Sequence, residues 1–318
     1  LWGGVADPAT GRPYEEDTCQ LVFSTTKGIV AICANQLIEQ GRLDPDARVA
    51  EYWPEFAQAG KEDVLVRWLL SHKAGLPVID GTLSIEETLA WDPVVEALAA
   101  QAPIWEPGTK HGYHATTFGW LVGELIRRVD GRSVGAYVAE ELAGPLGVDL
   151  WVGVPEDRLG QVAPLVPIDL PDNENVRMVI EQVLGPDSIT GKALRTPCPE
   201  LFGGTKGTID LSMFDDPRVL QAEIPAANGV TNARALARLY AATIGEVDGV
   251  RLLSEAQVAR ATERQTTGPD AVMFFETALG LGFFLSSAFS SYGGPRGFGH
   301  TGTGGSMGFA DPDAGIGY

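Results

Sequence analysis

The segment Ser24-Thr25-Thr26-Lys27 opens an apolar run that continues to Gln40 and stops at Gly41. Apolar residues recur in this run at intervals of three and four, a spacing that predicts a buried amphipathic helix, and glycine is typical of a helix end. A serine and a lysine three residues apart share one face of that helix. The sequence therefore places a hydroxyl beside an amine at a helix N-terminus, where backbone N–H groups and the helix dipole favour negative charge.

This pair suits nucleophilic catalysis. A serine hydroxyl is a weak nucleophile until a base removes its proton, and a partly buried lysine can lose its own proton and act as that base. Ser24 and Lys27 are therefore a candidate nucleophile and base. Because S-x-x-K is a short pattern that also arises by chance, the alternative is a helix-capping serine followed by a solvated lysine.

A second candidate segment is His111-Gly112-Tyr113-His114-Ala115. A phenol beside an ammonium group can carry a proton between a nucleophile and a leaving group, which makes Tyr113 a candidate relay. The alternative is a tyrosine with its ring in the core and its hydroxyl in water. His111 and His114 have no carboxylate ligand pattern close by, so we expect no metal site here.

A third segment, Gly299-His300-Thr301-Gly302-Thr303, is glycine-rich and strand-like. Glycines let the backbone approach a ligand closely, and its N–H groups could face an acyl oxygen; the alternative is a hairpin that needs glycines for its turn. The next residues match G-x-S-x-G around Ser306, but a nucleophile elbow requires strand, turn and helix with a later histidine, so we do not expect Ser306 to be the nucleophile. No P-loop or dinucleotide fingerprint is present, and we expect no cofactor.

The three segments together resemble the serine β-lactamase and penicillin-binding-protein-like hydrolases, in particular the class C-like branch that includes the family VIII carboxylesterases. That family carries S-x-x-K, Y-x-N and K-T-G motifs, and the corresponding residues occur here in the same order: Ser24-x-x-Lys27, Tyr113-x-Ala115 and His300-Thr301-Gly302. Other stretches are also similar to the family, namely residues 69–77, 144–147 and 279–282. The resemblance covers almost the whole chain.

The resemblance implies an acyl-enzyme mechanism. In it Ser24 is the acylated nucleophile, Lys27 its base and Tyr113 the proton relay to and from the leaving group. The backbone N–H groups of Ser24 and Thr303 form the oxyanion hole. The residues that the resemblance assigns to substrate binding are His300, Gly302 and Ala115.

Two positions depart from the family pattern. Ala115 stands where β-lactamases usually carry an amide side chain, and His300 replaces a lysine that is charged near neutral pH. An unperturbed histidine has a pKa of about 6.5, so it is less cationic at pH 7 than lysine. We expect hydrolysis of short-chain, uncharged esters and slow turnover of β-lactams. The alternatives are a β-lactamase, D-amino-acid peptidase or acyltransferase of the same fold, or a non-catalytic scaffold.

The order of predicted elements indicates the fold. Residues 1–13 are typical of a strand end and a turn, and residues 279–285, 297–301 and 305–310 of an antiparallel meander. Helices are predicted at residues 64–71, 84–101, 116–129, 134–142, 233–244 and 254–262, the last with a capping box from Ser254 to Gln257. Strands at both ends with helices between them indicate that distant strands share one sheet.

We therefore expect an α+β, β-lactamase-like fold with an antiparallel sheet domain flanked by helices (residues 1–60 and 235–318) and a mostly helical domain (residues 61–234). The active site lies in the cleft between them. Loops such as residues 164–207 are expected to shape the pocket. Because the chain begins at Leu1 without Met and stops at Tyr318 inside a strand-like run, we also expect a fragment that is truncated at both ends.

The amino-acid composition excludes some classes of binding partner and indicates a cellular location. The 318 residues include 23 Lys+Arg and 42 Asp+Glu, a net charge of −19 that disfavours nucleic acid. No apolar run reaches the roughly 18 to 20 residues that cross a bilayer. The cysteines, Cys19, Cys33 and Cys198, are too few and too scattered for a disulfide framework, so a reducing, cytoplasmic location is expected. Secretion stays open, because a signal peptide would precede Leu1. The expected partner is a small ester.

Overall fold

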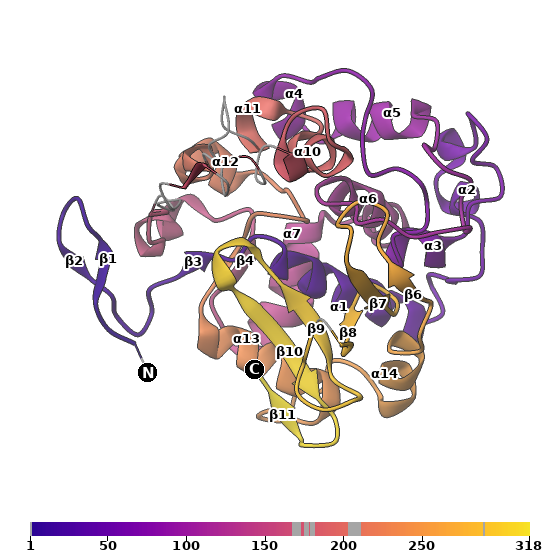
Figure 1. Ribbon diagram of the computed structural model, residues 1–318. Coiled ribbons are helices and arrows are strands. Elements are labelled where there is room, and N and C mark those ends of the chain that lie inside the picture. The colour runs from indigo at the N-terminus through magenta and orange to yellow at the C-terminus, as the bar shows by residue number, and fades with distance from the viewer. Residues whose placement is uncertain (1, 167–172, 175–177, 179–181, 203–210, 289) are drawn as a thin grey trace.

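The computed structural model describes residues 2–166, 173, 174, 178, 182–202, 211–288 and 290–318. A six-stranded antiparallel sheet forms one side of the described molecule and helices form the other (Figure 1). The helix α1 (Thr25–Glu39) lies between them, in contact with two strands of the sheet and with α6 (Thr117–Asp130). This arrangement confirms the expected α+β fold class.

The large sheet comes entirely from the last part of the chain. The expectation that strands from the two ends of the chain share one sheet is therefore wrong for the described residues, because β1 (Val5–Asp7) and β2 (Arg12–Pro13) pair only with each other. The strands of the large sheet are β6 (Thr266–Pro269), β7 (Glu276–Leu279), β8 (Phe284–Leu285), β9 (Phe298–Thr301), β10 (Met307–Asp311) and β11 (Ile316–Gly317). Each strand pairs with the next one in sequence, so the sheet is the predicted antiparallel meander. The helix α13 (Ala233–Ile244), at its predicted bounds, packs against β10 and β11.

The single strand predicted at residues 279–285 is wrong, because the chain turns inside it. Leu279 pairs with Phe284 across β7 and β8, and the Gly280 N–H donates to the Phe283 carbonyl oxygen at 2.9 Å. Gly282 has a φ of +88°, a conformation that side chains on L-residues disfavour. The glycines therefore make a tight hairpin. The prediction missed it because the apolar residues on either side of the glycines read as one continuous strand.

The helix α1 begins directly after Ser24 and ends before Gln40, which confirms its predicted bounds. It is buried on nearly all sides, so the prediction of an amphipathic helix is wrong. Small residues make such packing feasible. A Cβ atom at Gly28 would clash with the hydroxyl group of Tyr240 on α13. The N-terminal end of α1 is consequently a rigid, desolvated platform for the residues that follow Ser24.

The helix predicted at residues 84–101 is two helices, α4 (Ile85–Leu89) and α5 (Asp92–Ala100). The break has a local cause. Trp91 has a φ of +68°, and Pro93 has no N–H group to continue the hydrogen-bond ladder. The prediction therefore overlooked a proline that can only occupy the first turn of a helix.

The remaining helices are short. They are α2 (Val49–Tyr52), α3 (Val66–Leu70), α7 (Val134–Tyr137), α8 (Gly144–Leu146), α10 (Ile189–Arg195), α11 (Pro199–Phe202), α12 (Pro217–Gln221) and α14 (Glu255–Ala261). Turns of 3₁₀ type lie at η1 (Pro54–Phe56), η3 (Glu156–Gln161), η4 (Ser212–Asp215) and η5 (Thr303–Gly305). In the described part of the chain, no helix combines the length and apolar character that a membrane span requires.

Two helix predictions need correction. The helix expected at residues 134–142 is α7 followed by a π-helical segment, η2 (Val138–Ala143). The capping box at α14 is only half formed: the Ser254 hydroxyl accepts the Gln257 N–H at 3.1 Å, but the Gln257 side chain donates to Asn35 Oδ1 instead. A distant partner on α1 therefore outcompetes the local one.

Two smaller sheets complete the fold. The strands β3 (Gln20–Leu21), β5 (Gly229–Thr231) and β4 (Leu150–Val152) form a three-stranded antiparallel sheet. The strands β1 (Val5–Asp7) and β2 (Arg12–Pro13) pair as a hairpin that projects from the body, as the strand and turn predicted for residues 1–13 require (Figure 1). Because β3 ends only three residues before Ser24, its pairing with β5 anchors the chain that enters α1.

Candidate active site

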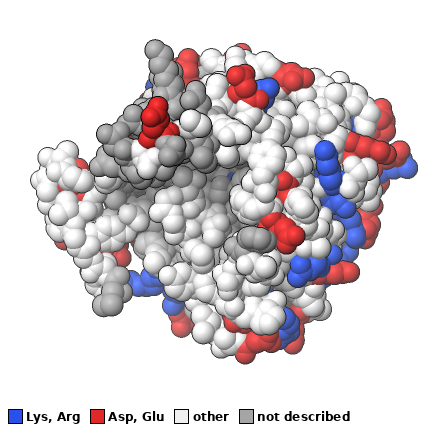
Figure 2. All heavy atoms as spheres, viewed as in Figure 1, with Lys and Arg blue, Asp and Glu red and all other residues white. Residues whose placement is uncertain are grey.

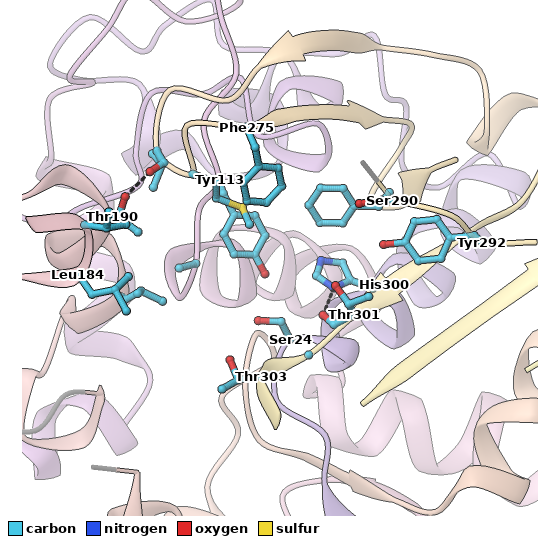
Figure 3. Close-up of a pocket in the computed structure, with 17 residues that line it drawn as sticks. Ser24, Tyr113, Leu184, Thr190, Phe275, Ser290, Tyr292, His300, Thr301 and Thr303 are labelled. Atoms are coloured by element: carbon cyan, nitrogen blue, oxygen red, sulfur yellow. Dashed lines mark hydrogen bonds between the residues drawn. The ribbon is translucent and has the colours of Figure 1, made fainter. Parts of the chain in front are cut away.

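Ser24 is the N-cap residue of α1, but its side chain caps nothing. No hydrogen bond joins its hydroxyl to an N–H of the first turn, and the preceding Phe23 has a φ of +44°. The hydroxyl instead faces a cavity, which it lines together with Tyr113 and His300 (Figure 3). The alternative of a helix-capping serine is therefore wrong, and the hydroxyl is free to react.

Lys27 is fully buried one turn into α1. Its Nζ lies 3.1 Å from Ser24 Oγ, 2.7 Å from the carbonyl oxygen of Ala115 and 2.9 Å from that of Ala226. No carboxylate pairs with it in the described part of the chain, and burial holds the pKa of Lys27 well below its usual range. The alternative of a solvated lysine is therefore wrong.

Tyr113 lines the same cavity as Ser24 and is 7% exposed, and its hydroxyl is hydrogen-bonded to Ser24 rather than only to water as in the alternative interpretation. Its ring centroid is 4.9 Å from Lys27 Nζ. Its hydroxyl points toward Ser24 (Figure 3). Burial raises the pKa of Tyr113, and a hydrogen bond with Ser24 partly offsets that rise. The three residues Ser24, Lys27 and Tyr113 are thus in mutual contact.

His300 lies on β9 with its ring against those of Tyr113 and Phe284. Its Nδ1 lies 2.6 Å from the Thr301 carbonyl oxygen, which can only accept, so Nδ1 carries the proton and Nε2 is an acceptor. Nε2 is buried without a hydrogen-bond partner. Burial, aided by the charge of Lys27, lowers the pKa of His300 to about 3. The imidazole is therefore neutral near pH 7.

Gly302 and Thr303 follow His300 and line the same cavity as Ser24. The Gly302 N–H donates to the Ser306 carbonyl oxygen at 2.8 Å, which closes the turn η5. Among the described residues, neither the Ser24 N–H nor the Thr303 N–H donates to another group. Ala115 lines the cavity too, and its carbonyl oxygen binds Lys27. The structure thus brings together the residues that the resemblance assigns to catalysis and substrate binding: Ser24, Lys27, Tyr113, Ala115, His300, Gly302 and Thr303.

Ser306 is not placed as a nucleophile. It sits between η5 and β10 rather than between a strand and a helix. Its hydroxyl donates to the Val22 carbonyl oxygen at 2.6 Å and lies 3.1 Å from Thr25 Oγ1. Ser306 therefore fastens the glycine-rich turn to the start of α1.

His111 and His114 do not converge on a common point. His111 lies between the hydroxyls of Thr266 and Thr277, at 2.9 Å from each. The ring of His114 contacts the Gly112 carbonyl oxygen at 2.7 Å and accepts the Leu76 N–H at 3.0 Å. Within the described ranges, no cluster of three His, Cys, Asp or Glu side chains is arranged to hold a metal.

The cavity itself is mostly apolar, with a volume of about 380 Å³. The space-filling view shows a hollow on this face that is walled mostly by uncharged side chains (Figure 2). Its wall includes residues that the motifs did not reveal: Val183, Leu184, Thr190, Leu194, Val272, Met273, Phe275, Phe284, Ser290 and Tyr292.

Some of this wall was anticipated. Four of these residues fall within 164–207, as expected, but Thr190 and Leu194 lie on the helix α10 rather than on a loop. Residues 167–172, 175–177, 179–181 and 203–207 lie outside the described residues. The other wall residues could not be predicted from the sequence, because an apolar residue that faces a cavity has the same sequence pattern as one that faces the core. Ala226 was also missed, since only its backbone carbonyl takes part.

Comparison with known proteins decides the family. The Beta-lactamase family model matches residues 1–318. The chain belongs to the β-lactamase family. The Esterase/beta-lactamase LipL of Mycobacterium tuberculosis is 36% identical over 332 residues, which cover 100% of this chain and 72% of LipL. The family resemblance inferred from the three motifs is thereby confirmed.

Solved structures of β-lactamase-family relatives superpose closely. A family VIII carboxylesterase is 36% identical, with a TM-score of 0.85 over 100% of this chain and 80% of its own. A penicillin-binding protein homologue from Caulobacter crescentus is 37% identical, with a TM-score of 0.82 over 99% of this chain and 80% of its own. The relatives that resemble this chain thus include proteins described as esterases and a protein described as a penicillin-binding protein homologue.

Proposed function

We propose that the protein is a carboxylesterase that hydrolyses short-chain, uncharged esters through an acyl-enzyme on Ser24. One observation carries the mechanism: the buried Lys27 amine lies 3.1 Å from Ser24 Oγ with no carboxylate beside it in the described structure. The names of the relatives, an esterase/β-lactamase and a family VIII carboxylesterase, support the choice of an ester substrate.

Burial favours a neutral Lys27 amine, and the three contacts of its nitrogen allow that amine to act as the base. A neutral amine has two N–H donors and one lone pair, and the carbonyl oxygens of Ala115 and Ala226 accept two donors. The third contact of the nitrogen is Ser24 Oγ. In the neutral state the lone pair therefore faces the serine proton that must be removed.

The chemistry then follows in two steps. Ser24 Oγ attacks the ester carbonyl while its proton passes to Lys27, and the N–H groups of Ser24 and Thr303 stabilise the oxyanion. The alcohol leaves with a proton delivered by Lys27 through the hydroxyl of Tyr113. Water then loses a proton to the same pair and attacks the acyl-enzyme; the bond from the acyl carbon to Ser24 Oγ breaks, the pair returns the proton to Ser24 Oγ, and the acid is released.

The cavity supports a small, uncharged substrate. Its volume of about 380 Å³ corresponds to roughly a dozen water-sized groups, at about 30 Å³ each. The neutral His300 ring offers no positive charge to a carboxylate, and Ala115 offers no amide side chain to an acylamide. Both features favour esters over β-lactams and over peptides with a free carboxylate, which are the substrates of two of the alternatives, the β-lactamase and the D-amino-acid peptidase.

Labelling with a fluorophosphonate tests the mechanism. The reagent phosphonylates an activated serine, so mass spectrometry is expected to find one adduct on the peptide that contains Ser24. Ser24→Ala should remove both the adduct and p-nitrophenyl acetate hydrolysis, whereas the control Ser306→Ala should keep the adduct. An unlabelled wild-type protein, or an adduct that persists in Ser24→Ala, contradicts the proposal.

The same samples separate an esterase from an acyltransferase of the same fold. With p-nitrophenyl acetate and an added alcohol, the esterase is expected to release mainly free acetate. Faster formation of the transfer product than of free acetate would instead indicate an acyltransferase. A non-catalytic scaffold would give neither product.

Substrate charge selectivity is expected to depend on His300. His300→Lys should raise kcat/KM for an ester with a carboxylate in its acyl part, relative to a neutral ester of equal length, by about tenfold. The reason is that a charged hydrogen bond is worth about 1.5–3 kcal/mol. The uncharged control His300→Gln should leave the ratio near the wild-type value. An unchanged ratio in His300→Lys would show that the residue does not set charge selectivity.

A further inference from the structure

The carboxylate of Asp270 joins two parts of the site that come from distant segments. Its Oδ1 accepts three backbone N–H groups, from Val272 at 2.8 Å, Met273 at 2.9 Å and Tyr113 at 3.0 Å. Asp270 is only 2% exposed. The sequence contains no motif around it, and its role emerges only from these contacts.

Two of the three bonds are local and one is not. Asp270 opens the loop between β6 and β7, and the bonds to Val272 and Met273 make the kind of turn that aspartate often stabilises. The loop is closed further by the Asp270 N–H, which donates to the Phe275 carbonyl oxygen at 3.0 Å. The bond from Tyr113, 157 residues earlier in the chain, has no such local explanation.

Each end of this connection faces the cavity. Tyr113 presents its hydroxyl to Ser24, and Val272 and Met273 form part of the apolar wall. A second bond, from the Ala271 N–H to the His111 carbonyl oxygen at 3.0 Å, holds the loop against the Tyr113 segment. The loop therefore cannot shift without moving the phenol or breaking buried hydrogen bonds.

We infer that Asp270 is a positioning residue that fixes the Tyr113 backbone and the Val272–Met273 part of the cavity wall relative to each other. It therefore sets both the rate of proton relay and the preference for acyl-chain length. This inference rests on the proposed esterase function. Asp270 itself touches no reacting atom, so its influence passes through the backbone of Tyr113 and through the wall.

The chain offers a matched control in Asp311. Its carboxylate also accepts three backbone N–H groups, from Gly294 at 2.7 Å, Asp313 at 3.0 Å and Ala314 at 3.2 Å, and it is 6% exposed. Two of these bonds are local and one is remote, as for Asp270. Asp311 does not line the cavity, so loss of its carboxylate should cost stability without changing catalysis.

The experiment measures kcat and kcat/KM for p-nitrophenyl acetate and hexanoate, per active site titrated with a fluorophosphonate. Asp270→Ala is expected to lower kcat per titrated site about a hundredfold, the effect of misplacing a reacting group by about 1 Å. It should also change the hexanoate-to-acetate ratio. Asp270→Asn, which keeps an Oδ1 acceptor, should restore most of both values, and Asp311→Ala should match the wild type in both.

Two results would overturn the inference: wild-type kcat per site with an unchanged chain-length ratio in Asp270→Ala, or an equal loss in Asp311→Ala. If Asp270→Ala does not fold, Asp270→Glu carries the same expectations, because its longer side chain displaces the acceptor while keeping the charge. Failure of the proposed function looks different, since the wild-type protein would then neither bind the fluorophosphonate nor hydrolyse either ester.

Discussion

Lys27→Met is expected to lower kcat for p-nitrophenyl acetate by about 10²–10⁴-fold, the usual contribution of a positioned general base. Methionine is apolar and unbranched, so it can occupy the buried path of the lysine side chain. It leaves Ser24 Oγ without the nitrogen that now lies 3.1 Å away. Steady-state kinetics per fluorophosphonate-titrated site measure the loss.

The pH dependence gives an independent readout of the same group. Burial lowers the pKa of Lys27, and the deprotonated amine is the active base, so wild-type kcat/KM should rise with pH through that lowered pKa and then level off. Unfolded Lys27 keeps its proton up to a pH of about 10.4. Its contribution to stability therefore rises with pH between the two pKa values. In Lys27→Met, both the rise of kcat/KM with pH and the rise of stability with pH that come from Lys27 should be absent.

Lys61 provides the control for Lys27. It is also fully buried, its Nζ donates to the carbonyl oxygens of Ala99 and Gln101, and burial lowers the pKa of Lys61 to about 8. It lies outside the cavity. Lys61→Met should therefore alter the pH dependence of stability and leave kcat near the wild-type value. Comparable kcat losses in the two variants would mean that Lys27 acts only through the fold.

Acidification from pH 7.5 to 4.5 is expected to lower the free energy of unfolding strongly, because buried histidines stay neutral in the folded state. Burial lowers the pKa of His114 to about 4 and that of His300 to about 3. In the unfolded chain each binds a proton below about pH 6.5. The stability they provide is therefore complete above pH 6.5 and is lost toward pH 4 and pH 3, at a cost on the order of 2–3 kcal/mol each by pH 4.5.

The hydrogen bonds explain why protonation is so unfavourable. His114 accepts the Leu76 N–H, so a proton on that nitrogen would face another donor. His300 lies near Lys27, which adds repulsion to the cost of burial. His72, whose ring is 5.4 Å from that of His114, also has a pKa held well below its usual range by burial. All three histidines therefore make the folded state less stable as the pH falls.

Urea unfolding at the two pH values measures the effect. The double variant His114→Gln and His300→Gln removes two of the titrating groups, so its stability should fall less on acidification than that of the wild type. An equal fall in both proteins would assign the acid sensitivity to other groups.

Parts of the fold were readable from local sequence. The bounds of α1 and α13 follow from apolar spacing and end signals, and the helix predicted at 116–129 corresponds to α6. Predictions failed where a single residue overrides the pattern, as Pro93 does in the first turn of α5 and Gly282 does between β7 and β8. Such residues act through the backbone dihedral angles, so the spacing of apolar residues cannot predict their effect.

The sequence by itself determined the chemistry on offer: Ser24 and Lys27 one turn apart, a phenol at Tyr113 and an imidazole at His300 in place of a lysine. Their family resemblance rests on residue identity and order, which need no coordinates. Tertiary structure decided how those groups behave. The loss of water around Lys27, the Ala226 carbonyl that binds it and the Asp270 link to the Tyr113 segment depend on residues far apart in the chain. Desolvation and hydrogen bonding at such a site arise only when those residues pack together.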